Sequence, residues 1–132
     1  MKCFFTLCGT IGVGAVFFAS MPAGGQTQTI KPPSLVRIAE LEIDPGKLSE
    51  YRNALSVEIA TSVREEAGVL NLYAVAVKGQ PNQIRIFEVY KDQAAYESHL
   101  QSPHFKKYKE ETHWMVKSLK LIETEPVMLA SK

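Results

Sequence analysis

Histidines are the residues of this sequence best suited to proton transfer, because imidazole titrates near neutral pH. His99 lies on a short predicted helix, where we expect it to line a cavity between helices and a sheet. His104 comes just inside the next predicted helix, and a surface position in its first turn is the favoured interpretation. A lone histidine is more often a hydrogen-bonded structural residue, so catalysis and structure remain alternatives for His99.

Glu88 is the second candidate for acid–base chemistry. The period of a strand places Ile84, Ile86, Glu88 and Tyr90 on one face. Burial among apolar side chains would raise the pKa of this carboxyl and allow it to act as a base. The alternative is that Glu88 is hydrated at the open end of the sheet or paired with a basic neighbour.

Aromatic residues are the candidates for substrate binding. Tyr73, Phe87, Tyr90 and Trp114 are expected to form one wall of a flat pocket. The alternative is that these side chains belong to an ordinary hydrophobic core.

The spacing of possible ligands argues against a metal site. His99 and His104 are separated by five positions with Pro103 between them, which is not the i, i+4 spacing that presents two ligands on one helix face. Motifs typical of phosphate-binding loops, dinucleotide sites, serine hydrolases and zinc peptidases are absent from the sequence. We therefore expect no metal.

The N-terminal residues 1–25 resemble a secretory signal peptide. Lys2 precedes an apolar segment, and small residues at 19–25 offer cleavage after Ala23 or Gly25. An uncleaved anchor is the alternative, but the segment is at the short limit for spanning about 30 Å of hydrocarbon. We expect export to the periplasm or secretion, with no stable membrane association after cleavage. Both cysteines, Cys3 and Cys8, would be removed, which leaves the mature chain without a thiol.

The length and charge of the chain define its broad class. The 132 residues suffice for one domain, and a formal net charge of +1 gives no reason to expect nucleic acid as a partner. Residues 26–34 are polar and proline-rich and read as a linker, residues 35–125 as the folded domain, and residues 126–132 as a C-terminal tail.

Hydrophobic patterning within 35–125 predicts the order β-α-β-β-α-α-β. The predicted strands are 35–43, 69–77, 83–90 and 119–125, with a turn at 78–82. A long helix begins at Asp44-Pro45 and presents a core stripe of Leu48, Tyr51, Leu55, Ile59 and Val63. Shorter helices follow Asp92 and Ser102-Pro103, and the second carries Phe105, Tyr108, Thr112, Met115 and Val116 along one side.

This order predicts a ferredoxin-like α+β fold. Helices on one face of a four-stranded sheet leave the other face bare, and a second copy of the chain is the simplest cover. We therefore expect a homodimer.

The stretch from Phe87 to Tyr108, FEVYKDQAAYESHLQSPHFKKY, resembles the signature of the antibiotic biosynthesis monooxygenase family. The upstream stretch Glu65–Leu70 is similar to another motif of that family, with Tyr73 at its aromatic position. The resemblance covers about residues 35–125.

The resemblance implies a dimeric α+β barrel and small aromatic or quinol-like substrates. In some members O₂ oxidises the substrate without metal, flavin or haem, so no cofactor is expected. The substrate is deprotonated and its anion reduces O₂. By this resemblance His99 is the base or orienting group and Glu88 assists it, while Tyr73, Phe87, Tyr90, His104 and Trp114 are the substrate-binding candidates.

Other members of the family provide the alternatives. The positions that haem-degrading relatives use hold Ala39, His99 and Lys109 here, which argues against haem degradation. Relatives that isomerise small ketones share much of the 99–104 stretch, so a non-oxidative isomerase remains open. A non-catalytic small-molecule-binding module is the third reading, favoured if His99 and Glu88 both face solvent.

Overall fold

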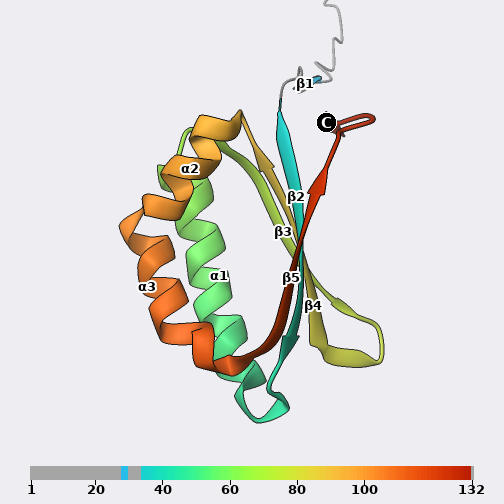
Figure 1. Ribbon diagram of the computed structural model, residues 1–132, viewed down its shortest axis with the longest axis vertical. Helices are drawn as coiled ribbons and strands as arrows, with labels where there is room; N and C mark the ends of the chain where they lie inside the picture. The colour runs from blue at the N-terminus through green and yellow to red at the C-terminus, as the bar shows by residue number, and fades with distance from the viewer. Residues whose placement is uncertain (1–27, 30–33, 132) are drawn as a thin grey trace, which may run out of the picture.

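The computed structural model describes residues 28–29 and 34–131, so the predicted signal peptide lies outside the described residues. One antiparallel sheet of four strands has the order β3-β4-β2-β5, and the helices cover one of its faces (Figure 1). The strands are β2 Leu35–Ile43, β3 Val69–Val77, β4 Gln80–Tyr90 and β5 Val116–Thr124. The helices are α1 Leu48–Glu65, α2 Gln93–Gln101 and α3 Pro103–Thr112, with single 3₁₀ turns η1 Pro45–Lys47 and η2 His113–Met115. The predicted ferredoxin-like fold is confirmed.

Side-chain caps set the starts of the helices. Asp44 accepts a hydrogen bond from the Gly46 N–H at 2.8 Å, and Asp92 accepts one from the Ala95 N–H at 2.8 Å. Ser102 caps α3 by accepting from the Phe105 N–H at 3.3 Å. Pro103 follows it at the first helical position, so the chain stops α2 and starts α3 in a new direction.

The hairpin between β3 and β4 is tighter than the predicted five-residue turn. Its turn is Lys78-Gly79, and Gly79 has φ +79°, which glycine adopts without steric cost. Strand β4 therefore begins at Gln80 and includes Pro81. Proline is tolerated there because β4 pairs with β2 only from Gln83 onward.

Strand β5 begins at Val116, three residues before the predicted start. Helix α3 ends at Thr112, and η2 turns the chain so that Met115 is buried. Val116 then pairs with Ile43 of β2, so the prediction that placed Val116 on a helix is wrong.

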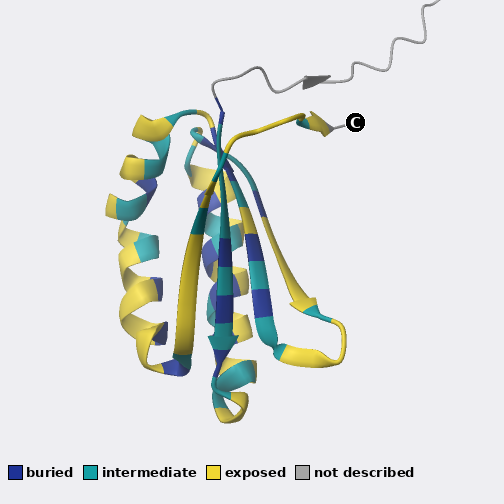
Figure 2. Cartoon of the chain, turned by 45° about the vertical axis from the view of Figure 1, so that its right-hand side comes forward, coloured by how far each residue is buried: buried dark blue, intermediate teal, exposed yellow. Residues whose placement is uncertain are grey.

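The core lies between the sheet and the helices (Figure 2). Ala39, Leu41, Ile84 and Ile86 of the sheet pack against the helices in one buried cluster. The predicted core positions of Tyr51 and Leu55 on α1 are confirmed, because both residues belong to the same cluster.

Towards the C-terminal end of α1, the buried face carries polar side chains in place of the predicted apolar ones. Val63 is 48% exposed, so its assignment to the core is wrong. Glu58 and Ser62 occupy the buried face instead, with exposures of 6% and 0%. The Ser62 hydroxyl donates a hydrogen bond to Glu58 Oε1 at 2.7 Å, so the two buried side chains satisfy part of each other's hydrogen-bonding capacity.

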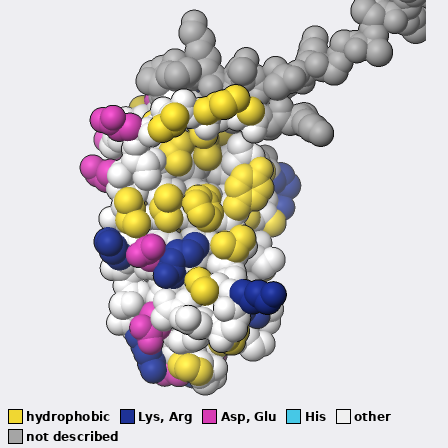
Figure 3. Space-filling view, turned by 90° about the vertical axis from the view of Figure 1, so that its right-hand side faces the viewer, with side chains coloured by type: hydrophobic (Ala, Val, Ile, Leu, Met, Phe, Trp, Pro, Cys, Tyr) yellow, Lys and Arg dark blue, Asp and Glu magenta, His cyan; other side chains and the backbone are white. Residues whose placement is uncertain are grey.

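The opposite face of the sheet carries exposed apolar side chains. Tyr73 is 59% exposed, Val75 50% and Phe87 41%. Figure 3 shows hydrophobic side chains gathered across this face.

Short strands also occur within the segments predicted as linker and tail. Strand β1 Gln28–Thr29 pairs antiparallel with β6 Ala130–Ser131. Within the described residues, none of the helices is long and apolar enough to cross a membrane.

Candidate active site

A cavity of about 100 Å³ lies between the helices and the covered face of the sheet. Its wall is largely apolar, with Glu58, Glu88 and His99 among the polar exceptions. Leu119 and Leu121 of β5 also line it, and their exposures of 43% and 52% place an opening along this edge strand. A mostly apolar hollow with few converging polar groups is typical of a small-molecule site.

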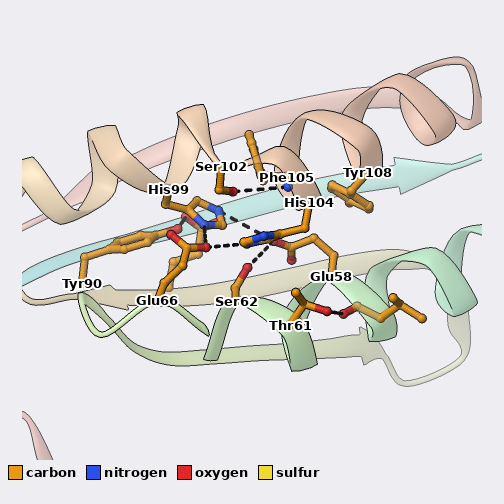
Figure 4. A network of polar contacts seen from close by, with 12 residues as sticks. Glu58, Thr61, Ser62, Glu66, Tyr90, His99, Ser102, His104, Phe105 and Tyr108 are labelled. Carbon is orange, nitrogen blue, oxygen red and sulfur yellow. Dashed lines mark hydrogen bonds and ion pairs between the residues drawn. The ribbon is translucent and has the colours of Figure 1, made fainter. Parts of the chain in front are cut away.

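His99 is the polar centre of the site. It lies on α2, is 3% exposed, and packs its ring on Phe105 with a centroid separation of 4.5 Å. Its Nδ1 lies 2.9 Å from Glu66 Oε1, and its Nε2 lies 3.9 Å from Glu58 Oε1 (Figure 4). The prediction that His99 lines a cavity between helices and sheet is confirmed.

Glu66 fixes the hydrogen-bonding state of this histidine. It lies directly after α1, and its Oε1 contacts both His99 and His104. Although partial burial raises the pKa of Glu66, the hydrogen bonds from the two histidines outweigh this and lower it. An ionised Glu66 requires the proton of neutral His99 on Nδ1, which leaves the Nε2 lone pair on the side of Glu58 and the cavity.

Sequence reasoning assigned no functional role to Glu66, Glu58 or the tyrosine pair of the cavity. Glu66 belongs to a stretch that resembles the family, which was the one available signal for it. Glu58 follows Tyr51 and Leu55 at helical spacing, so periodicity was the signal that could have placed it on the buried face of α1.

His104 is part-buried, so its predicted surface position is wrong. Its Nε2 lies 2.6 Å from Glu66 Oε1, and its side chain is 19% exposed. The break at Ser102-Pro103 redirects α3, which turns His104 back towards α1. His99 and His104 lie on different helices, as their spacing predicts, but the fold brings ligand-type atoms of Glu58, His99 and His104 to within 4.8 Å of one another.

Two carboxyls of the cavity have raised pKa values. Burial raises the pKa of Glu58, against the lowering effects of the Ser62 hydrogen bond and the nearby histidines. Burial likewise raises the pKa of Glu88, whose Oε2 accepts a hydrogen bond from the Tyr90 hydroxyl at 3.1 Å. The inward orientation predicted for Glu88 is confirmed. Arg85 on the other face pairs with Glu40 instead, at 3.2 Å.

A pair of tyrosines lies next to the cavity. The hydroxyls of Tyr51 and Tyr108 are 2.6 Å apart, and Tyr108 lines the cavity wall. Burial raises the pKa of Tyr51 to about 12 and that of Tyr108 further. Both therefore stay protonated near neutral pH and can act as hydrogen-bond donors.

The predicted aromatic wall is not assembled in the structure. Tyr90 contacts the His99 ring with a centroid separation of 5.4 Å. Tyr73 and Phe87 pair across strands on the outer face of the sheet, because side chains alternate along a strand. Trp114 is 52% exposed and packs against the Lys47 ammonium at 4.5 Å from its ring centre. These three residues therefore do not line the cavity next to His99.

A sequence model of the antibiotic biosynthesis monooxygenase family matches residues 34–111, more than half of the chain. The chain belongs to the antibiotic biosynthesis monooxygenase family. The matched range includes His99, His104, Glu58, Glu66 and Glu88, so the polar side chains of the cavity lie within the family domain.

Solved structures agree with this membership. A structure from Bacteroides thetaiotaomicron, provisionally described as an antibiotic biosynthesis monooxygenase, is 52% identical, with 72% of this chain and 90% of that chain covered and a TM-score of 0.71. A structure from Lactobacillus acidophilus, provisionally described as a monooxygenase, is 28% identical over 79% of this chain, which spans 48% of that longer chain, with a TM-score of 0.69. Rv0793 from Mycobacterium tuberculosis, at 23% identity over 74% of this chain and 99% of its own, shares the fold with a TM-score of 0.67. Among curated proteins, none matches the chain.

Proposed function

We propose that this protein is a cofactor-independent monooxygenase that oxidises a small aromatic or quinol-like substrate with O₂. The observation that carries the proposal is the dyad of Glu66 and His99, with the Nε2 atom of His99 on the side of Glu58 and the cavity. Family membership supports an oxidation as the reaction class, and the dyad would supply the base that a cofactor-free reaction needs.

The size and lining of the cavity support a small ring as substrate. A dry cavity of roughly 150 Å³ holds benzene in an engineered protein. The present cavity of about 100 Å³ is of comparable size and is lined by Leu41, Ile86 and Phe105 among others. Larger substrates would extend through the opening beside Leu119 and Leu121.

The proposed reaction begins with proton transfer from a substrate hydroxyl to His99 Nε2. The Glu66 carboxylate stabilises the imidazolium that forms, through the hydrogen bond to Nδ1. The substrate anion then transfers one electron to O₂, and the substrate radical and superoxide combine into a peroxide anion. This anion takes the proton back from His99 to form a hydroperoxide. Loss of water leaves a carbonyl, so one oxygen atom enters the product and the other leaves as water, with two substrate hydrogens.

The raised pKa values of Glu58 and Glu88 suit this chemistry. A protonated carboxyl can donate a hydrogen bond to a substrate oxygen that becomes negative. Burial disfavours negative charge on both groups, so the substrate anion meets less repulsion than two ionised carboxylates would cause.

Oxygen uptake by metal-free protein with a panel of hydroquinones tests the proposal. We expect substrate-dependent uptake, with turnover reduced by about 10²–10⁴-fold in His99→Ala. His113→Ala is the matched control, because His113 is exposed and contacts the Glu110 carbonyl of its own helix. Uptake that stays at background, or a rate unchanged in His99→Ala, would contradict the proposal.

A non-oxidative isomerase is the second candidate, because the same dyad could move a proton within a small ketone. Turnover under strictly anaerobic conditions would establish it. The non-catalytic binding module is less well supported, since His99 is buried and Glu88 faces the covered side of the sheet.

We further propose that the protein is exported and acts as a homodimer joined through the outer face of the sheet. The exposed Tyr73, Val75 and Phe87 support the dimer, because apolar patches of this kind mark association surfaces. The composition of residues 1–25 supports export.

A further inference from the structure

Glu58, His99 and His104 come from three different helices and bring one ligand-type atom each to within 4.8 Å of one another. We propose that this cluster is a binding site for a divalent transition-metal cation, with Zn²⁺ as the type ion. The inference goes beyond the proposed oxidation chemistry, and binding can be measured without any substrate.

The donor set suits Zn²⁺. Two imidazoles and one carboxylate are three protein ligands, the number found in open zinc sites that keep a fourth position for water or a ligand. Zinc–ligand bonds of about 2.0–2.2 Å place the donor atoms of a tetrahedral site roughly 3.3–3.6 Å apart. The 3.9 Å between His99 Nε2 and Glu58 Oε1 is close to this value, and the three donor atoms must draw together from within 4.8 Å to complete the site.

Charge also favours a cation at this position. Glu58 is 6% exposed, and its Oε1 accepts a hydrogen bond from the neutral Ser62 hydroxyl. The histidines are further surrounded by the carboxyls of Glu66 and Glu88. Buried carboxylates are stable when they are paired or bind a metal, and Zn²⁺ would supply that compensation.

Glu66 orients the His99 ring for metal binding. Its Oε1 lies 2.9 Å from His99 Nδ1 and 2.6 Å from His104 Nε2. Histidines that bind metals usually donate their second ring N–H to a carboxylate, as His99 does here, which leaves the Nε2 lone pair of His99 on the side of Glu58. Because the two hydrogen-bonded nitrogens point at one oxygen, the opposite nitrogens of the two rings point apart. His104 must therefore turn its Nε2 from Glu66 to the ion in order to bind it.

Two hollows give access to the cluster. Glu58 lines both the cavity that contains His99 and an outer groove of about 480 Å³ between α1 and α3, which His104 also lines. A cation can therefore enter along the groove without passing through the substrate cavity.

Bound Zn²⁺ would occupy the lone pair that the proposed reaction uses on His99. If the proposed function is correct, Zn²⁺ inhibits turnover by competing with proton transfer. This consequence rests on the proposed function, whereas metal binding itself does not.

The test is titration of chelator-treated, full-length protein with Zn²⁺ by calorimetry and with Co²⁺ by visible absorption. We expect one ion per chain and the intense visible bands of four-coordinate Co²⁺. Glu58→Gln and His104→Ala should each weaken binding by about 100-fold or more, because each removes a direct ligand. Glu66→Gln should weaken it by about 10–100-fold, as expected for a group that orients the ligands.

His113→Ala is the control for adventitious binding to a surface histidine, and it should leave the affinity unchanged. Glu58→Gln keeps the side-chain volume and removes a buried charge, so it gives the answer even if His104→Ala does not fold. Absence of binding, or binding that is unchanged in Glu58→Gln, would overturn the proposal, and so would binding that is lost in His113→Ala. Activity measured without metal is a separate readout, so failure of the proposed function leaves the result of the titration intact.

Discussion

The two faces of the sheet differ in which side chains depart from the usual distribution, with polar groups inside and apolar groups outside. On the helix-covered face, Glu88 is inward-facing and lies near the buried His99 and Glu58. On the open face, Tyr73 and Phe87 are 59% and 41% exposed. Buried polar groups and exposed aromatic residues both cost stability in an isolated chain. The comparison teaches that the two proposals rest on opposite faces, the reaction on the covered face and the homodimer on the open face.

The largest effect is expected from a charge placed on the open face. Phe87→Glu should raise the Kd of the proposed homodimer by about 100-fold or more, because it puts a carboxylate at the centre of an apolar contact. Sedimentation velocity over a concentration series measures this change.

Val57→Lys is the matched control for that variant. Val57 is also an exposed apolar residue, at 68%, but it lies on α1 in the helix layer. It should leave the dimer unchanged. A monomeric parent protein, or equal effects of the two substitutions, would break the comparison between the faces.

The covered face should be sensitive to added volume. A Cβ atom at Gly68 would lie 2.5 Å from the Ala95 Cβ of α2, so Gly68→Ala must push α2 away from the start of β3. We expect a loss of about 2 kcal/mol in the free energy of unfolding, measured by urea denaturation. Gly46→Ala, whose Cβ would meet Asp44 Oδ1 at an ordinary 3.4 Å, should cost much less. Equal costs at the two glycines would argue against close packing of α2.

Replacing one glutamate by glutamine on each face compares how the two faces contribute to stability. The folded-state pKa of Glu88 is raised by burial, so its contribution to stability is greatest at low pH and is lost as pH rises through the folded pKa. Glu88→Gln should therefore increase the free energy of unfolding at pH 8 by about 1 kcal/mol, and by less at pH 4. Glu40→Gln on the open face removes only a partly exposed ion pair with Arg85 and should change stability little. Destabilisation by Glu88→Gln at pH 8 would show that the ionised carboxylate is favoured in the fold.

The smallest effect is expected at Val63. Because this side chain is 48% exposed, Val63→Lys should change the free energy of unfolding by less than about 0.5 kcal/mol. Thermal melting measures it. A loss of several kcal/mol would place Val63 in a buried contact and restore the stripe that the sequence pattern predicts.

The order of elements was predictable because it depends on local signals. The alternation along β4 was sufficient to place Glu88 on the covered face, and Asp92 and Ser102-Pro103 marked the starts of α2 and α3. The β3–β4 turn was predicted too long, since a single glycine in the left-handed region replaced the five-residue loop.

The site was less predictable because it depends on tertiary contacts. His99 could be identified as a cavity residue, but its partner Glu66 lies beyond the reach of any periodicity argument. Periodicity could have placed Glu58 on the buried face of α1, since it follows Tyr51 and Leu55 at helical spacing, but it could not predict the approach of His99 to this carboxyl. Tyr73 and Phe87 were grouped with the site by residue type, whereas the alternation of the strand places them on the other face.

The polar contacts of Glu66 have a consequence for how the site forms during folding. Glu66 is 33 residues from His99 and 38 from His104 along the chain, and the whole β3–β4 hairpin lies between them. The dyad therefore needs α2 to dock beside the end of α1, and the second contact of Glu66, with His104, needs α3 to dock as well. Contacts of such long sequence separation carry a loop-closure cost and tend to form late. A partly folded chain thus holds no aligned base, which makes the histidine–glutamate contact a reporter of completed folding.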